Sequence, residues 1–290
     1  MPPTVLLTND DGIDAVGLRA LSDALDAFDV TVVAPATNQS GVGGARSWWD
    51  ATVEYEETET GYAVEGTPAD CVAVADVALD LDPDIVVSGC NHGPNIGAHI
   101  LGQSGTVGAA MEASFLGTPA VAVSLYDRGN LPVPPTLGTD AFALAAEVVS
   151  DILDDATRSG GDVALPFGAD VLNVNVPAAD DEAADRPTYR LTEPARGFDV
   201  IEFRPGETEA GESGFDERRG EMGMELRDRF WREFLRGDVP DDPGSDRRAA
   251  VEGEVSISPL SSSRSVATDR AGDVVAIRGD ETAPPERQSE

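Results

Sequence analysis

Short apolar runs alternate with amphipathic stretches over the first two thirds of the chain. Residues 5–8 and 30–34 are short, mostly apolar runs typical of buried parallel strands, and residues 15–28 between them repeat apolar side chains at helical spacing. The same alternation continues with an apolar stretch at 71–81, with predicted strands at 84–88, 120–125 and 171–176, and with predicted helices at 106–116 and 140–153. This order predicts an α/β fold with a doubly wound, mostly parallel, Rossmann-like sheet.

The pattern changes after about residue 187. Residues 189–191 and 200–203 are predicted to be short strands that could form a hairpin outside the sheet. Residues 225–236 are predicted to form an amphipathic helix ending at Gly237, and 251–257 a strand running into Ser258-Pro259-Leu260. We therefore expect a catalytic core at 1–187, a C-terminal extension at 188–278 and a disordered tail at 279–290. The apolar side of the helix would serve either core packing or oligomerisation.

The charge of the chain is strongly negative, with 20 basic and 54 acidic residues, a net charge of −34 and no lysine at all. Without lysine, a Walker A phosphate grip, Schiff-base chemistry and a receiver-type phosphoaspartate switch are excluded. No basic patch could neutralise a nucleic acid polymer, so we expect no such partner. The Asp-rich composition predicts a halophilic source, because concentrated salt screens self-repulsion. An ordinary acidic cytosolic protein is the alternative.

The remaining composition suggests a cytoplasmic protein. Cys71 and Cys90 lie among small or apolar residues, which predicts buried free thiols. The chain has no signal-like start and no apolar run of about 18 residues, the length that a membrane span requires. We therefore expect no membrane partner.

Two adjacent carboxylates, Asp10 and Asp11, directly follow the first predicted strand. In open α/β sheets, ligands bind outside the carboxyl ends of the strands. Neighbouring carboxylates repel each other, and a hard divalent cation with oxygen ligands relieves that repulsion. The alternative is a simple turn in which Asp11 or Asp14 caps the next helix.

Three further polar segments continue the pattern. Ser40 lies in a glycine-rich loop after the second strand, Asn91 and Asn95 follow the strand at 84–88, and Ser104 to Thr106 open a helix of small residues. Each alone also fits a turn or an N-cap. Together they supply two anionic and two neutral oxygen ligands suited to Mg²⁺ or Mn²⁺, beside a helix start suited to phosphate. The sequence therefore predicts metal-assisted hydrolysis of a phosphate ester, with the Asp pair as catalytic groups.

Six motifs resemble those of the SurE family, and their order and spacing match across nearly the whole chain. They are LLTNDDG at 6–12, NQSG at 38–41, GTPADCV at 66–72, VSGCN at 87–91, SGTVGAAME at 104–112 and VSISPL at 255–260. The resemblance implies a metal-dependent 5′/3′-nucleotidase acting on nucleoside monophosphates. Some members of the family also trim short polyphosphate. The family forms dimers or tetramers through C-terminal elements, so we expect a homodimer or homotetramer.

The resemblance also implies roles for individual residues. One divalent ion per subunit, Mn²⁺, Mg²⁺ or similar, would be held by Asp10, Asp11, Ser40 and Asn91. The phosphate would be held by Asn95, Ser104, Gly105 and Thr106. Asn9, beside the carboxylate pair, would shape the first loop or touch the substrate. Independently of the resemblance, His92 lies in the same group of loops and could assist the leaving group, because histidine is a common general acid.

The chain departs from the family pattern at the predicted rim of the pocket. Ala98 and His99 stand where acidic residues are common, and Gly102-Gln103 replaces a shorter segment that usually carries an aromatic. These changes put base preference in doubt more than chemistry. Cys90 stands where an aliphatic residue is common in the family, which is a conservative packing change. None of the six motifs falls in residues 207–246, so the mode of assembly stays open. Two roles are open for Trp48 and Trp49. They could stack on the base of a nucleotide, or they could pack at the edge of the core.

Two other functional classes could place acidic or polar ligands at the end of a first strand. A haloacid-dehalogenase-type phosphatase needs an Asp-x-Asp pattern after the first strand, whereas Asp11 is followed by Gly12 and Ile13. A non-catalytic nucleotide, phosphate or metal sensor could use the same ligands without turnover. It remains the alternative from a different functional class.

Overall fold

The computed structural model describes residues 2–127, 137–158, 163–178, 187–198, 200–203, 225–228, 234 and 236–262. The strands are β1 (Thr4–Thr8), β2 (Asp29–Pro35), β3 (Glu54–Glu57), β4 (Tyr62–Glu65), β5 (Ile85–His92), β6 (Ala120–Tyr126), β7 (Val171–Pro177), β8 (Tyr189–Leu191), β9 (Val200–Phe203), β10 (Glu225–Asp228) and β11 (Val255–Leu260). The helices are α1 (Val16–Ala24), α2 (Pro68–Val77), α3 (Ala98–Leu101), α4 (Gly105–Phe115), α5 (Ala143–Thr157) and α7 (Asp246–Val251), with 3₁₀ turns at Thr139–Phe142 and Pro166–Gly168.

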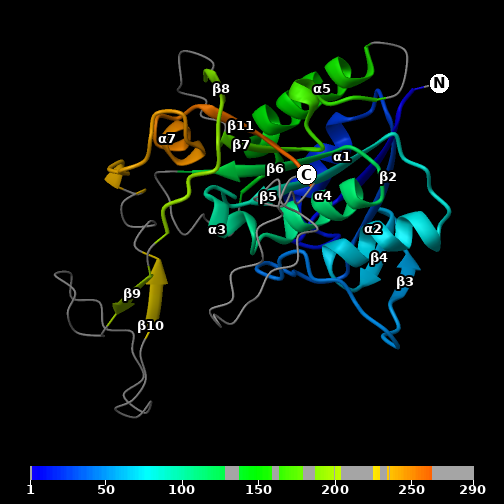
Figure 1. Cartoon of the computed structure of the whole chain (residues 1–290). Helices are drawn as coiled ribbons and strands as arrows, with labels where there is room; N and C mark the ends of the chain where they lie inside the picture. The colour runs from blue at the N-terminus through cyan, green and yellow to red at the C-terminus, as the bar shows by residue number, and fades with distance from the viewer. Residues whose placement is uncertain are drawn as a thin grey trace, which may run out of the picture.

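Nine of these strands form one mixed sheet in the order β3-β4-β2-β1-β5-β6-β7-β11-β8 (Figure 1). From β4 to β7 all neighbours are parallel, and β3 and β11 run antiparallel to their inner neighbours. The strand order reverses at β1, because β2 lies on one side of it and β5 on the other. Such a switch point leaves a crevice at the carboxyl edge of an α/β sheet.

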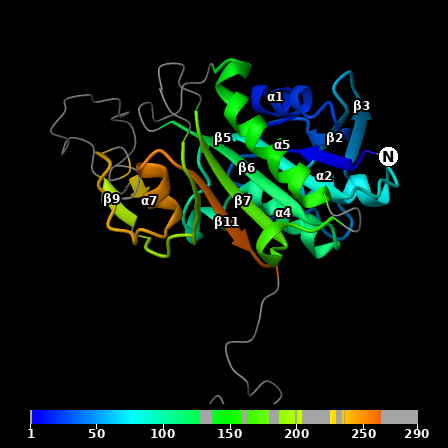
Figure 2. The ribbon, with the colours of Figure 1, turned by 90° about the horizontal axis from the view of Figure 1, so that it is seen from above.

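Helices cover both faces of this sheet, as the doubly wound prediction requires. α1 and α5 lie on one face and α2 and α4 on the other (Figures 1 and 2). The alternation of side chains along β1 explains why: Val5 and Leu7 join the apolar cluster beneath α1 and α5, whereas Leu6 joins the cluster beneath α2 and α4. Both faces of the central strands are therefore buried.

The start of α2 shows how one of the family-like motifs acts locally. The Thr67 hydroxyl accepts the Asp70 N–H at 3.1 Å, and the Asp70 carboxylate accepts the Thr67 N–H at 2.9 Å. Pro68 occupies the first turn, where its missing N–H costs nothing. This capping box sets the point at which α2 begins.

The predicted core elements are confirmed, with two differences. β5 continues to His92, so Asn91 lies within this strand rather than after it. The register with β6 shifts between Ser88 and Asn91. After the shift the strand continues, because Asn91 and His92 pair with Ser124 and Leu125. The β3-β4 pair and the short helix α3 had no prediction. β3 is exposed along its whole length, so it carries no buried apolar signal.

The C-terminal extension differs more from the prediction. β8 does not form a hairpin with β9; it adds to the main sheet, parallel to β11. Residues 225–228 were predicted to begin a helix, but they form β10, which pairs antiparallel with β9. β9 lies more than twenty positions earlier in the sequence, and the local spacing of apolar residues carries no information about pairing with so distant a segment. Residues 229–233 and 235 of that predicted helix lie outside the described residues.

The last predicted strand starts later than expected, because Val251 ends α7 and the strand β11 begins at Val255. Phe234, within the segment predicted to be an amphipathic helix, is fully buried and contacts Tyr126 edge-to-face at 6.5 Å between ring centroids. That residue packs inside the subunit. Helix 225–236 as an oligomerisation element is not confirmed, and the predicted tail at 279–290 lies outside the described residues.

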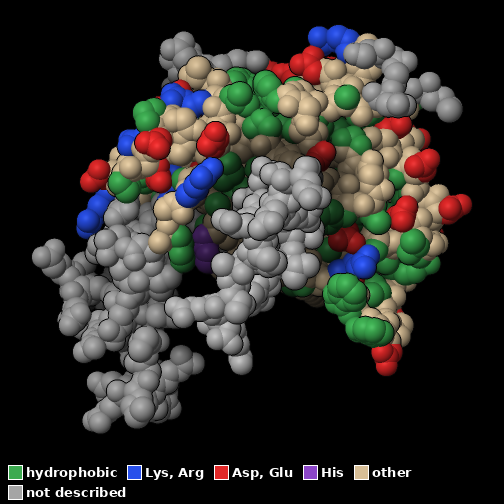
Figure 3. Space-filling view, viewed as in Figure 1, with side chains coloured by type: hydrophobic (Ala, Val, Ile, Leu, Met, Phe, Trp, Pro, Cys, Tyr) green, Lys and Arg blue, Asp and Glu red, His purple; other side chains and the backbone are tan. Residues whose placement is uncertain are grey.

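The described surface is rich in acidic groups. Asp and Glu side chains stand at separate places around the face seen in Figure 3, while Arg side chains are visible mainly on the side of α7. Within the described ranges, no helix has the length and apolar character needed to cross a membrane.

Candidate functional site

The predicted site residues lie around the switch point between β1 and β5. Asp10 and Asp11 follow β1, Ser40 follows β2, and Asn91 lies at the end of β5. The register pairs Thr8 of β1 with Ser88 of β5, so these strands end at the same edge of the sheet. The sheet therefore gathers segments that are up to about eighty residues apart in sequence.

Asp10 is tied directly to the start of α4. The Thr106 hydroxyl donates to Asp10 Oδ1 at 2.7 Å, and the two side chains are 0% and 3% exposed. Gly105 allows this approach, because a Cβ there would lie 2.7 Å from the Asp10 Cβ and 2.9 Å from Oδ2. The Thr106 hydroxyl is therefore committed to a carboxylate and faces away from solvent.

Asp11 is oriented by two other loops. The backbone N–H of His92 donates to Asp11 Oδ2 at 3.0 Å, and the Asn38 amide donates to Oδ1 at 3.1 Å. The alternative, in which Asp11 or Asp14 caps the next helix, is wrong: Ala15 is the N-cap of α1, and no side chain accepts a hydrogen bond there. The Asp11 carboxylate instead joins the ends of β1, β2 and β5.

Asn9 shapes the loop between these strands. Its side chain is 0% exposed, accepts the Gly12 N–H at 3.2 Å and donates to the Gly12 carbonyl at 2.9 Å. Gly12 has a φ of 107°, a conformation that favours glycine. Of the two roles left open for Asn9, shaping the loop agrees with its full burial.

Ser40 lies on an exposed loop that is anchored at both sides. Its N–H donates to Asn38 Oδ1 at 3.0 Å, and the Gly43 N–H donates to the Gln103 carbonyl at 2.9 Å. A Cβ at Gly108 of α4 would lie 2.5 Å from the Gly43 carbonyl oxygen, so the loop packs closely on the helix. The Ser40 loop thus connects the Asp11 side of the site with α4.

Asn91 and Asn95 have different surroundings. The half-buried Asn91 amide donates to the Gly93 carbonyl at 2.6 Å. Asn95 is 6% exposed and donates to the Ser124 hydroxyl at 2.8 Å. The sequence prediction missed the residues that hold the Asn95 backbone: Asn175 Oδ1 accepts its N–H at 2.8 Å, and Asn173 and Asn175 donate to its carbonyl at 2.9 and 3.1 Å. Their signal was two polar residues inside the apolar strand β7.

Ser104 is the N-cap of α4. Its hydroxyl accepts the Val107 N–H at 3.1 Å, and the residue is 5% exposed. The alternative for Ser104, a plain N-cap, is therefore present in the structure. An N-cap does not exclude an anion at the same helix start, because the other N–H groups of the first turn have no partner within the helix.

Electrostatics in the site favour a cation. Burial raises the pKa of Asp10, the Thr106 hydroxyl opposes that rise, and the adjacent Asp11 adds to it. Among the described residues, no group of three or more His, Cys, Asp or Glu side chains could hold a metal ion. A metal at this edge would therefore need neutral oxygens beside the two carboxylates. Ser40 and Asn91 offer such oxygens, and a hydroxyl, an amide and two carboxylates form a hard donor set that fits Mg²⁺ or Mn²⁺.

Three accessory residues were left open by the sequence. His92 Nε2 is buried without a hydrogen-bond partner among the described residues, and its ring contacts Phe142 edge-to-face at 6.2 Å. Trp48 and Trp49 are 69% and 92% exposed, so packing at the edge of the core is wrong for both. The Arg46 guanidinium lies 5.7 Å from the Trp48 ring centroid.

The fold is α/β, and the predicted site residues gather at the carboxyl edge of the switch point, where sheets of this kind bind ligands. Comparison with known families narrows this class. The profile described as Survival protein SurE matches residues 5–197, and the chain belongs to the SurE family.

Relatives with the name 5′-nucleotidase SurE cover most of the chain. The protein from Natronomonas pharaonis is 48% identical over 259 residues, covering 88% of this chain and 91% of the relative. The protein from Halobacterium salinarum is 43% identical over 275 residues, covering 94% and 97%. The crystal structure of the SurE protein from Aquifex aeolicus is 30% identical, with a TM-score of 0.68 over 91% of this chain and 95% of that one. These names support a nucleotidase activity.

Proposed function

We propose that this protein is a metal-dependent phosphomonoesterase that hydrolyses nucleoside 5′- and 3′-monophosphates to nucleoside and phosphate. The observation that carries the proposal is the 2.7 Å hydrogen bond between Thr106 and Asp10, which joins the proposed metal ligands to the start of α4. A metal held by Asp10 would lie beside the N-terminus of α4. One phosphate group could then bind the metal through one oxygen and the free N–H groups of the helix start through another. The relatives named 5′-nucleotidase SurE support the nucleotide as substrate.

Each residue has a definite task in this scheme. Asp10, Asp11, Ser40 and Asn91 would hold one divalent ion per subunit, Mn²⁺ or Mg²⁺, which when bound supplies Lewis-acid polarisation of the ester. Asn95, Ser104, Gly105 and Thr106 would orient the phosphate, Thr106 through its backbone N–H because its hydroxyl faces Asp10. One carboxylate of the Asp pair would accept a proton from the attacking water. Bonds from Thr106 to Asp10 and from His92 and Asn38 to Asp11 keep the two carboxylates oriented for this work.

We further propose a cytoplasmic homodimer or homotetramer built through the C-terminal extension. The charge of −34 supports an environment of concentrated salt, and the relatives from Natronomonas pharaonis and Halobacterium salinarum agree with it. Light scattering of the purified chain in concentrated salt tests the oligomer. A single monomeric species over the whole concentration range would contradict it.

A phosphate-release assay tests the activity. The purified protein in concentrated salt is offered nucleoside 5′- and 3′-monophosphates with Mn²⁺, with Mg²⁺, or with chelator alone. Asp10→Asn and Asp11→Asn should each abolish most of the release. Asp14→Asn is the matched control, because Asp14 is exposed in the same loop and caps no helix.

Three outcomes separate the candidate functions. Release that needs metal and is lost in both variants supports the hydrolase. Release that persists in chelator contradicts metal dependence. Nucleotide binding without release under any metal would favour the non-catalytic sensor instead.

A further inference from the structure

A fully buried carboxylate links the C-terminal extension to the site. Asp246, the first residue of α7, is 0% exposed and accepts three backbone N–H groups. Its Oδ2 accepts from Gly97 at 2.7 Å, and its Oδ1 accepts from Ala195 at 2.9 Å and from Arg247 at 2.8 Å. One side chain therefore holds the loop before α3, the segment after β8 and its own helix together.

The Gly97 side of this junction has no spare room. Gly97 has a φ of 84°, and a Cβ there would lie 2.5 Å from Arg247 Nη2. One residue later, the Ala98 N–H donates to the Ala195 carbonyl at 2.8 Å. The turn from Gly97 into α3 is thus seated directly on the extension.

The same loop carries Asn95, two residues before Gly97. Asn173 and Asn175 of β7 fix the Asn95 backbone from the sheet, as described above. Asp246 fixes the other end of the three-residue segment from the extension. These attachments hold the backbone of the segment at both ends, and the Asn95 side chain itself donates to the Ser124 hydroxyl of β6.

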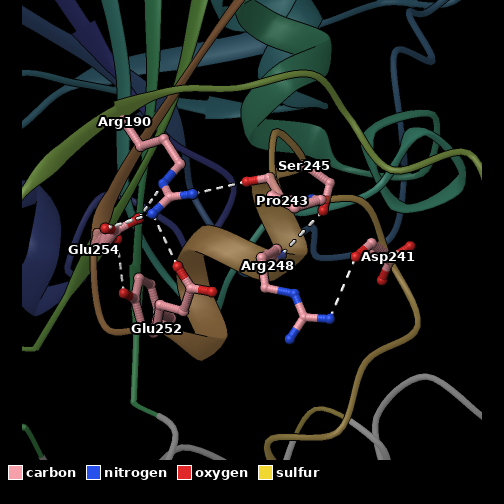
Figure 4. A network of polar contacts seen from close by, with 8 residues as sticks. Arg190, Asp241, Pro243, Ser245, Arg248, Glu252 and Glu254 are labelled. Carbon is pink, nitrogen blue, oxygen red and sulfur yellow. Dashed lines mark hydrogen bonds and ion pairs between the residues drawn. The ribbon is translucent and has the colours of Figure 1, made fainter.

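α7 itself is held in place, so Asp246 is a fixed point. Arg190 of β8 donates to the Pro243 carbonyl at 2.8 Å and forms ion pairs with Glu252 and Glu254, on either side of the turn that follows α7 (Figure 4). At the start of the helix, the Ser245 hydroxyl accepts the Arg248 N–H at 3.2 Å (Figure 4). The segment after β8 also contacts the start of α7, because the Asp246 N–H donates to the Glu193 carbonyl at 3.0 Å.

We propose that Asp246 is a positioning residue for phosphate binding: through the Gly97 N–H it sets the place of the loop that presents Asn95. The inference rests on the proposed function, in which Asn95 contacts the phosphate. The hydrogen bonds of the Asp246 carboxylate go to Gly97, Ala195 and Arg247, none of which is a proposed metal or phosphate ligand. A displacement of about 1 Å at a binding group can cost on the order of a hundredfold in rate, so losing this attachment has a measurable effect.

The test compares variants made on both sides of the junction. Asp246→Asn keeps the shape but replaces one accepting oxygen by an NH₂ group that faces N–H donors. Gly97→Ala pushes a methyl group against Arg247 from the opposite side. Asp170→Asn is the matched control: the Asp170 carboxylate also accepts three hydrogen bonds, from Ser261 and Ser262, but it precedes β7, at the opposite edge of the sheet from the site.

Three quantities are measured for each variant in concentrated salt: the dissociation constant of inorganic phosphate by calorimetry, KM and kcat for a nucleoside monophosphate, and the midpoint of the Mn²⁺ titration. In Asp246→Asn and Gly97→Ala, we expect the phosphate dissociation constant and KM to rise roughly tenfold to a hundredfold. The Mn²⁺ midpoint should stay within about twofold, because Asp10 and Asp11 are not attached to this junction. Asp170→Asn should leave all three quantities unchanged.

Several results would overturn the inference. One is unchanged phosphate binding in a folded Asp246→Asn protein. Another is an equal loss of phosphate and Mn²⁺ binding, which would indicate general loosening. A third is failure of both junction variants to fold while Asp170→Asn folds, since that would make Asp246 a determinant of folding rather than of position. If the wild-type protein binds phosphate but releases none from nucleotides, the proposed function fails and the binding data still decide the role of Asp246.

Discussion

Replacing Thr106 by valine removes one hydroxyl from the site and almost no volume. In the native protein that hydroxyl donates to Asp10 Oδ1 at 2.7 Å, and with exposures of 0% and 3% no water can easily take its place. A hydrogen bond to a charged group contributes about 1.5–3 kcal/mol. At about 1.4 kcal/mol per factor of ten, Thr106→Val should lower kcat/KM for a nucleoside monophosphate by roughly 10-fold to 150-fold.

The metal requirement identifies how the hydroxyl acts. If Thr106 orients Asp10, the valine variant needs more Mn²⁺ for half-maximal activity, and Thr106→Ser restores most of the rate. If the hydroxyl binds the phosphate instead, KM rises while the Mn²⁺ requirement stays the same.

Initial rates of phosphate release are measured over a range of nucleotide and Mn²⁺ concentrations. Thr157→Val is the control, because its hydroxyl donates to the Leu153 carbonyl at 2.8 Å in α5, away from the site. A Thr106→Val protein with kcat/KM within about twofold of the wild type would refute the reasoning, since a buried bond to a working carboxylate should not be dispensable.

Further predictions concern packing, pH, thiols and salt. Gly105→Ala should lower both activity and melting temperature, because the new methyl group would press on Asp10. In a helix, alanine is otherwise favoured over glycine by about 1 kcal/mol, so a stabilised and active variant would contradict this close contact. Burial raises the pKa of Asp246 above its ordinary value of 3.8. At a pH between the unfolded-state pKa and the higher folded-state pKa, the folded protein therefore binds a proton at Asp246 that the unfolded chain has already lost. In denaturant titrations, the free energy of unfolding of the wild type minus that of Asp246→Asn should therefore fall as the pH rises through this range. A difference that grows with pH would contradict a raised pKa for Asp246. Burial also raises the pKa of the Cys71 and Cys90 thiols, so a disulfide reagent at neutral pH should label them only after denaturant is added. Dialysis from concentrated to dilute salt should cost folded circular-dichroism signal, given the net charge of −34; full stability in dilute buffer would argue against salt adaptation.

The core of the fold was predictable because its signals are local. The apolar runs that became β1, β2, β6 and β7 have the composition of strands buried on both faces, and the helical spacing in α5 is uninterrupted. The carboxylate pair was equally visible, since Asp10 and Asp11 directly follow such a run. The boundaries of these elements moved by only a few residues in the structure.

The extension was less predictable because its structure depends on distant partners. Residues 225–228 have helical apolar spacing, yet they pair with β9 across a long stretch of chain. Asp246 lies among charged residues, where an acidic side chain normally suggests solvent exposure, and nothing local indicates its burial against Gly97 and Ala195.

The sequence by itself determined which chemical groups this protein has: two adjacent carboxylates, neutral oxygens after neighbouring strands, a small-residue helix start and no lysine. Only the tertiary structure decided how they are held. The order β2-β1-β5 brings the loops to one edge, Thr106 turns its hydroxyl to Asp10, and Asn173, Asn175 and Asp246 fix the Asn95 loop. The physical reason is that hydrogen bonds between residues about 50 to 150 positions apart depend on sheet order and burial, which one-dimensional periodicity does not encode.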